Sequence, residues 1–147
     1  MIINVEQRDL FSVPQGYMLA HCISADFALG AGIAKQFDDH FGLRKMLQLQ
    51  YGDTDWWGLC GPVCLCCANV LNLVTKERFY QKPTFSSLYE ALLDMKRLCL
   101  ERGYYKIALP RIGCGLDRLA WSDVEAIIKH TFQDTDIEFL VCLRGTE

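Results

Sequence analysis

Two glycine-rich loops, each following a short apolar run, are the features that most constrain the fold of this chain. The first run covers residues 17–23 (YMLAHCI), and the segment after it contains Gly30 and Gly32. The second run covers 107–109 and leads into the sequence PRIGCGLDRL at 110–119. Continuous apolar runs of this length are typical of strands covered on both faces of a sheet. The pattern therefore predicts two buried strands that each end in a glycine loop.

Glycine gives both loops the freedom to bind a ligand. It adopts positive φ at little cost and lets a ligand approach the backbone closely, and successive N–H groups of such a loop can hold phosphate. A helix predicted from Ile33, with Ile33, Ala34, Phe37 and Phe41 at helical spacing, places its N-terminus beside the first loop, and helix N-termini attract anions. The second loop alone is equally compatible with a structural turn, but its acid, Asp117, lies beside the candidate anion site and indicates chemistry.

Strands and helices alternate along the chain. We expect strands at 2–5, 17–23, 62–67, 70–75, 106–109 and 137–143, and helices from 33, at 43–50, after the N-cap Thr84 as far as Gly103, and from a capping box at 122–125. Residues 62–67 and 70–75 would form a hairpin, and 51–61 would be irregular. This order predicts an α/β fold, a three-layer α/β/α sandwich with a mixed central sheet. Residues 1–147 would form a single domain, with ligands outside the C-terminal ends of the strands.

Composition narrows the class of protein. Hydrophobic residues make up 51% of the 147 residues and charged residues 22%, which indicates a folded chain. A net charge of −3 gives no basic surface for duplex nucleic acid, so backbone amides would have to hold a small polyanion. The first residues do not read as a signal peptide, so we expect none, and no apolar stretch reaches membrane-spanning length. We therefore expect no membrane partner and a cytoplasmic protein, or a nucleocytoplasmic one in a eukaryote.

Eight cysteines raise the question of a metal site. Without a secretory signal they are expected to be reduced thiols. Cys64 and Cys67 form a CxxC pair, but there is no second CxxC or HxxxH to complete a zinc site. Their segment reads as a strand of small apolar residues, so we interpret them as core cysteines and expect no metal.

The two glycine loops also carry a resemblance to a known family. The strings HCISADFALGAGIA at 21–34 and PRIGCGLDRL at 110–119 are similar to those of macrodomains, the ADP-ribose-binding fold, and especially of the terminal ADP-ribose protein glycohydrolase branch. Shorter matches follow in the same order over nearly the whole chain: DLF at 9–11, AHCIS at 20–24, TK at 75–76, KPT at 82–84 and TDI at 135–137. The chain departs from the family pattern at Arg8, where glycine is usual, and at the hairpin turn.

The resemblance implies a role for each matched position. Lys76 resembles the catalytic nucleophile and Asp117 the acid/base. Asp9 and Leu10 would contact the adenine, and Ser24 the distal ribose. The two phosphates and the distal ribose would be wrapped by the backbone of Gly30, Ala31, Gly32, Ile33, Arg111, Ile112, Gly113, Cys114, Gly115 and Leu116. Because neutral amides would hold the phosphates, neither a metal nor a cofactor is required.

Each of these side chains also has an ordinary structural interpretation. Without the resemblance, Lys76 reads as a solvated strand end and Asp117 as a turn cap. His21 lies in an apolar run and reads as a hydrogen-bonded core histidine rather than a catalyst. Cys114, between two glycines, could be a thiol activated by a helix N-terminus, but we favour a role for its backbone alone.

Three functions are compatible with the sequence. The leading one is a hydrolase that removes ADP-ribose from Glu- or Asp-linked mono-ADP-ribosylated targets, deacylates O-acetyl-ADP-ribose, or does both. The others are a non-catalytic ADP-ribose-binding module and a hydrolase acting on ADP-ribosylated nucleic-acid bases. Only an enzyme needs Lys76 and Asp117 together, which favours the first. The expected partners are ADP-ribose or an ADP-ribosylated protein, with ADP-ribosylated nucleic acid as the alternative, and we expect a monomer.

Overall fold

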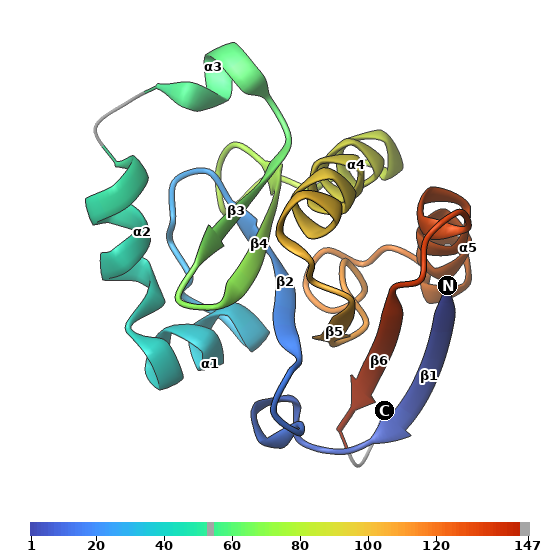
Figure 1. Ribbon diagram of the computed structural model, residues 1–147. Helices are drawn as coiled ribbons and strands as arrows, with labels where there is room; N and C mark the ends of the chain where they lie inside the picture. Colours follow the sequence, from blue (N-terminus) through green and yellow to red (C-terminus); the bar gives the residue numbers. More distant parts are fainter. Residues whose placement is uncertain (53–54, 145–147) are drawn as a thin grey trace.

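The fold is built around one mixed sheet, seen in the computed structural model, which describes residues 1–52 and 55–144 (Figure 1). Its six strands lie in the order β1-β6-β5-β2-β4-β3. They are β1 (Ile2–Gln7), β2 (Met18–Ser24), β3 (Val63–Cys67), β4 (Val70–Lys76), β5 (Lys106–Leu109) and β6 (Glu138–Leu143). All neighbouring strands pair in parallel except β3, which runs antiparallel to β4. The predicted mixed sheet is confirmed.

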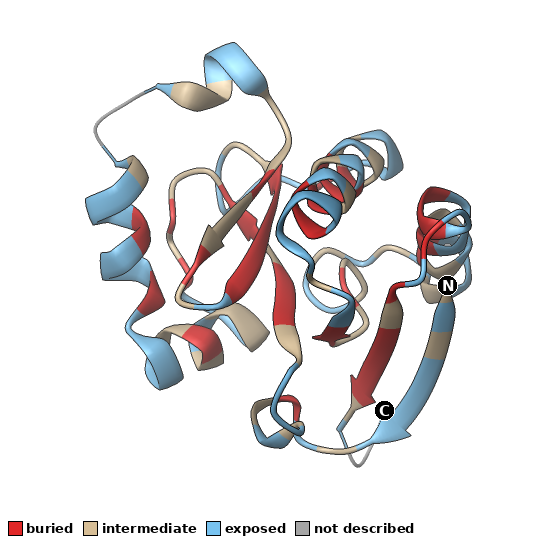
Figure 2. Cartoon of the chain, in the orientation of Figure 1, coloured by how far each residue is buried: buried red, intermediate tan, exposed pale blue. Residues whose placement is uncertain are grey.

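Helices cover both faces of this sheet. On one face lie α1 (Gly32–Phe41) and α2 (Leu43–Tyr51), which bury Phe37, Leu43 and Leu47 in the core. On the other lie α4 (Phe85–Arg102) and α5 (Trp121–Phe132). Figure 2 shows the buried residues concentrated on the central strands and on the helix sides that face them. The predicted three-layer α/β/α sandwich is therefore confirmed.

The centre of the sheet is the most apolar part of the molecule. Leu71, Leu73 and Val74 of β4 have no exposed surface, whereas the edge strand β1 is largely exposed. Burying one large aliphatic side chain stabilises a fold by about 1.5–3 kcal/mol, so β4 is held mainly by this burial. β4 therefore provides a well-packed support for Lys76 at its end. No helix in the described part of the chain is long and apolar enough to cross a bilayer.

The β3–β4 hairpin is confirmed and has a two-residue turn. Ala68 and Asn69 occupy the turn with φ of 54° and 60°. Positive φ at both central residues is what a two-residue turn between twisted strands requires. Because the turn is short, β4 runs directly back beside β3 and ends at Lys76.

Two local predictions were wrong. The capping box at 122–125 does not form, because the N-cap of α5 is Ala120, two residues before Ser122, and the helix begins at Trp121, whose side chain packs against the core. The reciprocal capping box lies instead at the start of α4, between Thr84 and Ser87. The segment 51–61 is not wholly irregular: Asp55 accepts a hydrogen bond from the Gly58 N–H and caps a short helix, α3 (Trp56–Cys60). Residues 53–54 of that segment lie outside the described part of the chain.

The parallel strands determine where the functional residues gather. The carboxyl ends of parallel strands meet at one edge of a sheet, where α/β folds bind ligands. Ser24 ends β2, Lys76 ends β4, and the loop at 110–119 follows β5. Asp9 follows β1 and caps the short 3₁₀ helix η1 (Leu10–Ser12). Residues far apart in the sequence are thus brought to one edge.

Candidate active site

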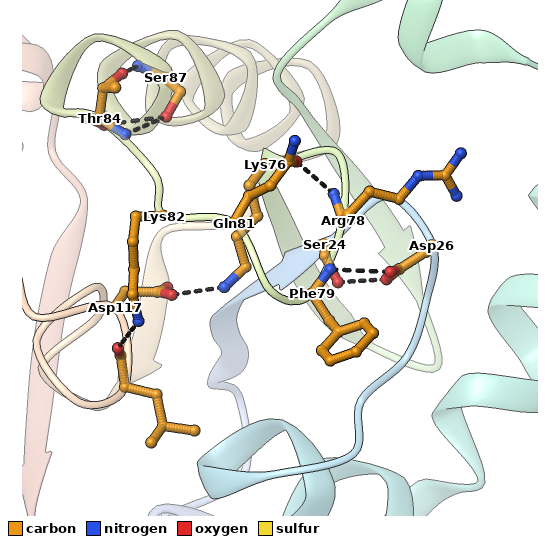
Figure 3. A network of polar contacts seen from close by, with 11 residues as sticks. Ser24, Asp26, Lys76, Arg78, Phe79, Gln81, Lys82, Thr84, Ser87 and Asp117 are labelled. Carbon is orange, nitrogen blue, oxygen red and sulfur yellow. Dashed lines mark hydrogen bonds and ion pairs between the residues drawn. The ribbon is translucent and has the colours of Figure 1, made fainter.

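The two residues assigned to catalysis are in direct contact. Lys76 Nζ donates a hydrogen bond to Asp117 Oδ1 at 2.6 Å (Figure 3). The Lys76 side chain is 14% exposed and the Asp117 side chain 15% exposed. Attraction between charges strengthens as water is excluded, and removing either partner would leave the other charge poorly compensated. The amine and the carboxylate are therefore largely shielded from solvent and are joined by one hydrogen bond.

A bulge at the end of β4 helps to aim Lys76. Ile23 of β2 pairs with Val74, but the next residue, Ser24, pairs with Lys76 instead of Thr75. The extra residue in β4 breaks the regular alternation of side chains, and such bulges re-aim side chains near functional sites. Thr75 stays buried while Lys76 reaches the loop that carries Asp117. No sequence signal indicated this bulge.

The loop at 110–119 is a succession of tight turns that present Asp117. The Leu119 N–H donates to the Gly113 carbonyl at 2.7 Å, and the Arg118 N–H donates to the Gly115 carbonyl at 3.2 Å. Gly113 has a φ of +73°, and a Cβ there would lie 3.0 Å from Leu119 Cδ1. Glycine is required at this position for both its backbone angle and its lack of a side chain.

The first glycine loop ends in an uncapped helix N-terminus. Ala31, the N-cap of α1, makes no side-chain capping bond, so the first N–H groups of α1 lack that acceptor. Gly30, Ala31 and Gly32 are exposed, and Ile33 is half-buried. These N–H groups and the helix dipole suit an anion.

The two glycine loops meet at the same edge of the sheet. A Cβ added to Gly32 would lie 3.3 Å from Leu116 Cδ1 of the second loop. Lys82 fixes the second loop from its other side, because its Nζ donates to the Leu116 carbonyl at 2.6 Å (Figure 3). The first and second glycine loops are therefore close neighbours at this edge.

Asp26 links several parts of the site and was not singled out from the sequence. Its Oδ1 accepts from Ser24 Oγ at 2.5 Å, and its Oδ2 accepts from the Phe79 N–H at 2.9 Å. It also accepts from the Ala28 N–H at 3.2 Å, a local bond of the kind that Asp makes in turns. The Ser-x-Asp spacing could have indicated that turn, but not the bond to Phe79. Lys82 was noted only as part of a motif, and its bond to Leu116 had no signal.

The predicted adenine contacts lie at the far end of the same edge. Both Asp9 oxygens accept bonds at 3.0 Å, from the Phe11 N–H and from Ser12 Oγ. The bond from Phe11 lowers the pKa of the Asp9 carboxyl, so Asp9 stays ionised near neutral pH. Leu10 is buried beside it. Three strands separate β1 from β4, a span of roughly 19 Å at ordinary strand spacing. An elongated ligand would be needed to reach from Asp9 to Lys76.

The sequence relatives decide the family. No family model matches the chain. It is similar to ADP-ribose glycohydrolase OARD1 of Bos taurus, with 42% identity over 143 residues that cover 95% of this chain and 90% of the bovine protein. The Homo sapiens protein of the same name is 41% identical over 143 residues, with the same coverage of 95% and 90%. This chain belongs to the OARD1 family.

Solved structures agree on the fold. The macrodomain of Mycobacterium tuberculosis DarG is similar with a TM-score of 0.78 and 20% identity, over 98% of this chain and 99% of that chain. Thermosipho africanus DarTG in complex with ADP-ribose is similar with a TM-score of 0.74 and 15% identity, over 99% of this chain and 42% of that chain. At these identities the likeness shows the fold, which is the macrodomain fold. The resemblance found in the sequence is confirmed.

His21 is a core residue of this macrodomain. It is fully buried, its Nε2 lies 2.7 Å from Asn72 Oδ1, and its ring stacks on Phe37 at 3.9 Å between centroids. Burial lowers the pKa of His21 from 6.5 to about 4, so the ring is neutral at ordinary pH. The structural interpretation of His21 is confirmed by these contacts.

Cys64, Cys67 and Cys114 pack in or against the hydrophobic cores. Burial raises the pKa of the Cys114 thiol, whose Sγ donates to the Ile112 carbonyl at 3.4 Å. Cys64 packs in the core under α4 and α5, whereas Cys67 packs in the core under α1 and α2. The CxxC pair thus faces opposite sides of the sheet, as spacing i, i+3 in a strand requires. No group of three potential metal ligands lies together in residues 1–52 and 55–144.

Two surface hollows of this OARD1-family chain are not lined by the catalytic pair. One, of about 360 Å³, lies between β1 and α5. The other, of about 250 Å³, is lined in part by Asp26, Trp56, Trp57 and Arg78. Neither is lined by Lys76 or Asp117. The catalytic pair therefore lies in neither hollow.

Proposed function

We propose that this macrodomain is an ADP-ribosyl hydrolase. It cleaves the ester bond between ADP-ribose and Glu or Asp side chains of mono-ADP-ribosylated proteins, and it deacylates O-acetyl-ADP-ribose. The observation that carries this proposal is the shielded contact of 2.6 Å between Lys76 and Asp117, beside two glycine loops that meet. The names of the bovine and human relatives, ADP-ribose glycohydrolase, support the same activity.

ADP-ribose would lie along the carboxyl edge of the sheet. Its phosphates would be held by the N–H groups at the start of α1 and by the backbone of residues 111–116, with the adenine towards Asp9 and Leu10. The similar DarTG structure was solved with ADP-ribose, which supports a site of this class. Because neutral N–H groups would hold the phosphates by hydrogen bonds, the proposed reaction uses neither a metal nor a cofactor.

The catalytic pair supplies both a nucleophile and a proton. Lysine attacks only as a neutral amine, so its proton must first leave. The short contact gives that proton a direct route to the Asp117 carboxylate. The amine then attacks C1 of the distal ribose, the bond from C1 to the target oxygen breaks, and the target leaves as a carboxylate.

Asp117 then resolves the covalent intermediate. Nζ releases one proton to water and Asp117 donates its proton to the ring oxygen, so the ribose ring opens and the bond from C1 to Nζ becomes a protonated Schiff base. Water adds to C1 with Asp117 as the base, the C1–Nζ bond breaks, and ADP-ribose leaves with the lysine amine regenerated. One carboxylate thus serves both steps, which agrees with its single contact to Lys76.

The alternatives fit the site less well. A non-catalytic binding module would need neither Lys76 nor Asp117, and the contact between them favours the hydrolase. A net charge of −3 gives little attraction for a nucleic-acid backbone, so we place ADP-ribosylated bases second. We also propose a monomer that works in the cytoplasm, or in the nucleus and cytoplasm of a eukaryote.

Release of ADP-ribose from a Glu-linked mono-ADP-ribosylated protein and hydrolysis of O-acetyl-ADP-ribose test this function. Lys76→Ala and Asp117→Ala should each lower kcat by about 10³-fold, since each removes a group that acts in the transition state. Lys96→Ala is the matched control, because Lys96 forms an ion pair of 2.7 Å with Asp134 away from the site. Full activity of Lys76→Ala would contradict the proposal.

A further inference from the structure

An exposed aromatic pair lies in the loop directly after the proposed nucleophile. Phe79 is 64% exposed and Tyr80 70% exposed, and their rings meet edge to face with centroids 5.4 Å apart. Neither ring belongs to the two buried cores. Aromatic residues are enriched in binding surfaces because they offer large apolar area at low entropic cost. The aromatic pair is therefore better suited to binding a partner than to stabilising the fold.

The loop holds these rings in a fixed place. The Phe79 N–H donates to Asp26 Oδ2 at 2.9 Å. The Arg78 N–H donates to Gln81 Oε1 at 2.7 Å, and the Gln81 N–H donates to the Arg78 carbonyl at 3.1 Å. Backbone bonds on both sides of the aromatic pair thus tie it to the turn and to the loop after β2. A fixed loop presents the rings without further ordering on binding.

The loop lies close to the proposed nucleophile. Phe79 follows Lys76 by three positions, so their Cα atoms are within about 11 Å of each other. In Figure 3 the Phe79 ring and the Asp117 carboxylate lie on opposite sides of the Lys76 side-chain nitrogen. Asp117 belongs to the loop proposed to wrap ADP-ribose. The opposite side is therefore available to whatever is attached to C1 of the distal ribose.

We propose that Phe79 and Tyr80 are specificity residues that bind an apolar side chain of the target polypeptide next to the modified Glu or Asp. This inference rests on the proposed function and adds the target side of the substrate. An apolar side chain gains stability by covering exposed rings. A polypeptide suits the local charges better than a nucleic acid does, because Asp26, Glu77 and Asp117 balance Lys76, Arg78 and Lys82, and a phosphodiester backbone needs an excess of cations.

Two substrates that differ only on the target side separate this role from ADP-ribose binding. O-acetyl-ADP-ribose releases acetate, which is too small to reach the rings, whereas a Glu-linked ADP-ribosylated protein can cover them. For Phe79→Ala/Tyr80→Ala, kcat/KM on the protein should fall about tenfold, the size of one or two lost aromatic contacts. On O-acetyl-ADP-ribose it should change less than twofold, and the Kd for free ADP-ribose should not change.

Tyr105→Ala provides the matched control. Tyr105 is 46% exposed and directly precedes β5, at the opposite edge of the sheet. It should leave kcat/KM for both substrates unchanged. An equal loss on both substrates in the double variant would overturn the proposal, since the rings would then contact the ADP-ribose part. No loss on either substrate would also overturn it.

Two further outcomes are distinguishable. A loss confined to an ADP-ribosylated single-stranded oligonucleotide, with the protein substrate unaffected, would overturn the choice of a polypeptide. A wild-type chain inactive on both ester substrates would overturn the proposed function, and this inference with it. An active wild type with an unaffected double variant would overturn this inference alone.

Discussion

At the scale of residues, one proton connects the two groups that do the proposed chemistry. Lys76 must give up a proton to attack, and Asp117 must hold one to open the ribose ring. Their contact of 2.6 Å meets both needs with a single transfer. A sequence without a known relative would not have paired them, because 41 positions separate them and each has an ordinary structural interpretation.

His21 makes stability depend on pH in a defined window. Its pKa is lowered from 6.5 to about 4 because burial disfavours the charged ring. Between pH 6.5 and 4 the unfolded chain binds a proton that the folded chain does not. Stability from this group is therefore complete above pH 6.5 and falls as the pH decreases towards 4.

Denaturant unfolding at pH 7 and pH 5 measures this effect. Of the loss of unfolding free energy between these values, about 2 kcal/mol should come from His21. His21→Gln keeps a polar partner for Asn72 but does not titrate, so its loss should be smaller by that amount. Equal losses in wild type and variant would show that His21 does not cause the effect.

At the scale of elements, the glycine loop after β5 combines a strained backbone angle with close packing. Gly113→Ala would force alanine to a φ of +73° and bring its Cβ to 3.0 Å from Leu119. We expect a loss of about 1–2 kcal/mol in the free energy of unfolding and about tenfold weaker ADP-ribose binding. Gly16→Ala is the control, with a φ of +98° and no atom near the new Cβ.

Calorimetric titration with ADP-ribose distinguishes the two glycines. Gly16 lies before β2, at the edge of the sheet away from the site, so its variant should lose stability but keep its affinity. If Gly113→Ala binds ADP-ribose as tightly as wild type does, then the loop does not wrap the ligand.

The elements also show what the sequence could and could not reveal. Apolar runs and glycines located the strands and both loops, because burial and positive φ leave local signals. The bulge at Thr75, the bonds of Asp26 and the contact of Lys82 with Leu116 left none. Each depends on segments that meet only after folding. The predicted start of α5 was wrong because its N-cap, Ala120, has no capping side chain that could mark the position in the sequence.

At the scale of the molecule, ligand binding should stabilise the whole fold. The proposed site draws on loops after β1, β2, β4 and β5, so ADP-ribose would join most of the sheet. At 100 times its Kd the ligand should add about 2.7 kcal/mol, which raises Tm by about 8 °C for a domain of this size. Thermal unfolding with and without ADP-ribose measures this shift.

The rise in Tm caused by ADP-ribose should persist in the presence of a chelator, because the proposed site holds phosphate with N–H groups alone. Thermal unfolding with ADP-ribose in the presence of EDTA provides the comparison. A shift abolished by EDTA and restored by a divalent cation would show that a metal helps to hold the ligand.

Covalent trapping is the most direct test of the central claim. The wild-type chain is incubated with a Glu-linked ADP-ribosylated protein and sodium cyanoborohydride, which reduces a Schiff base to a stable amine, and the modified residue is identified by mass spectrometry. We predict an ADP-ribose adduct on Lys76, none at that position in Lys76→Ala, and none on Lys96 in either. Normal release of ADP-ribose without any adduct on Lys76, or with the adduct on another residue, would contradict a lysine nucleophile at position 76.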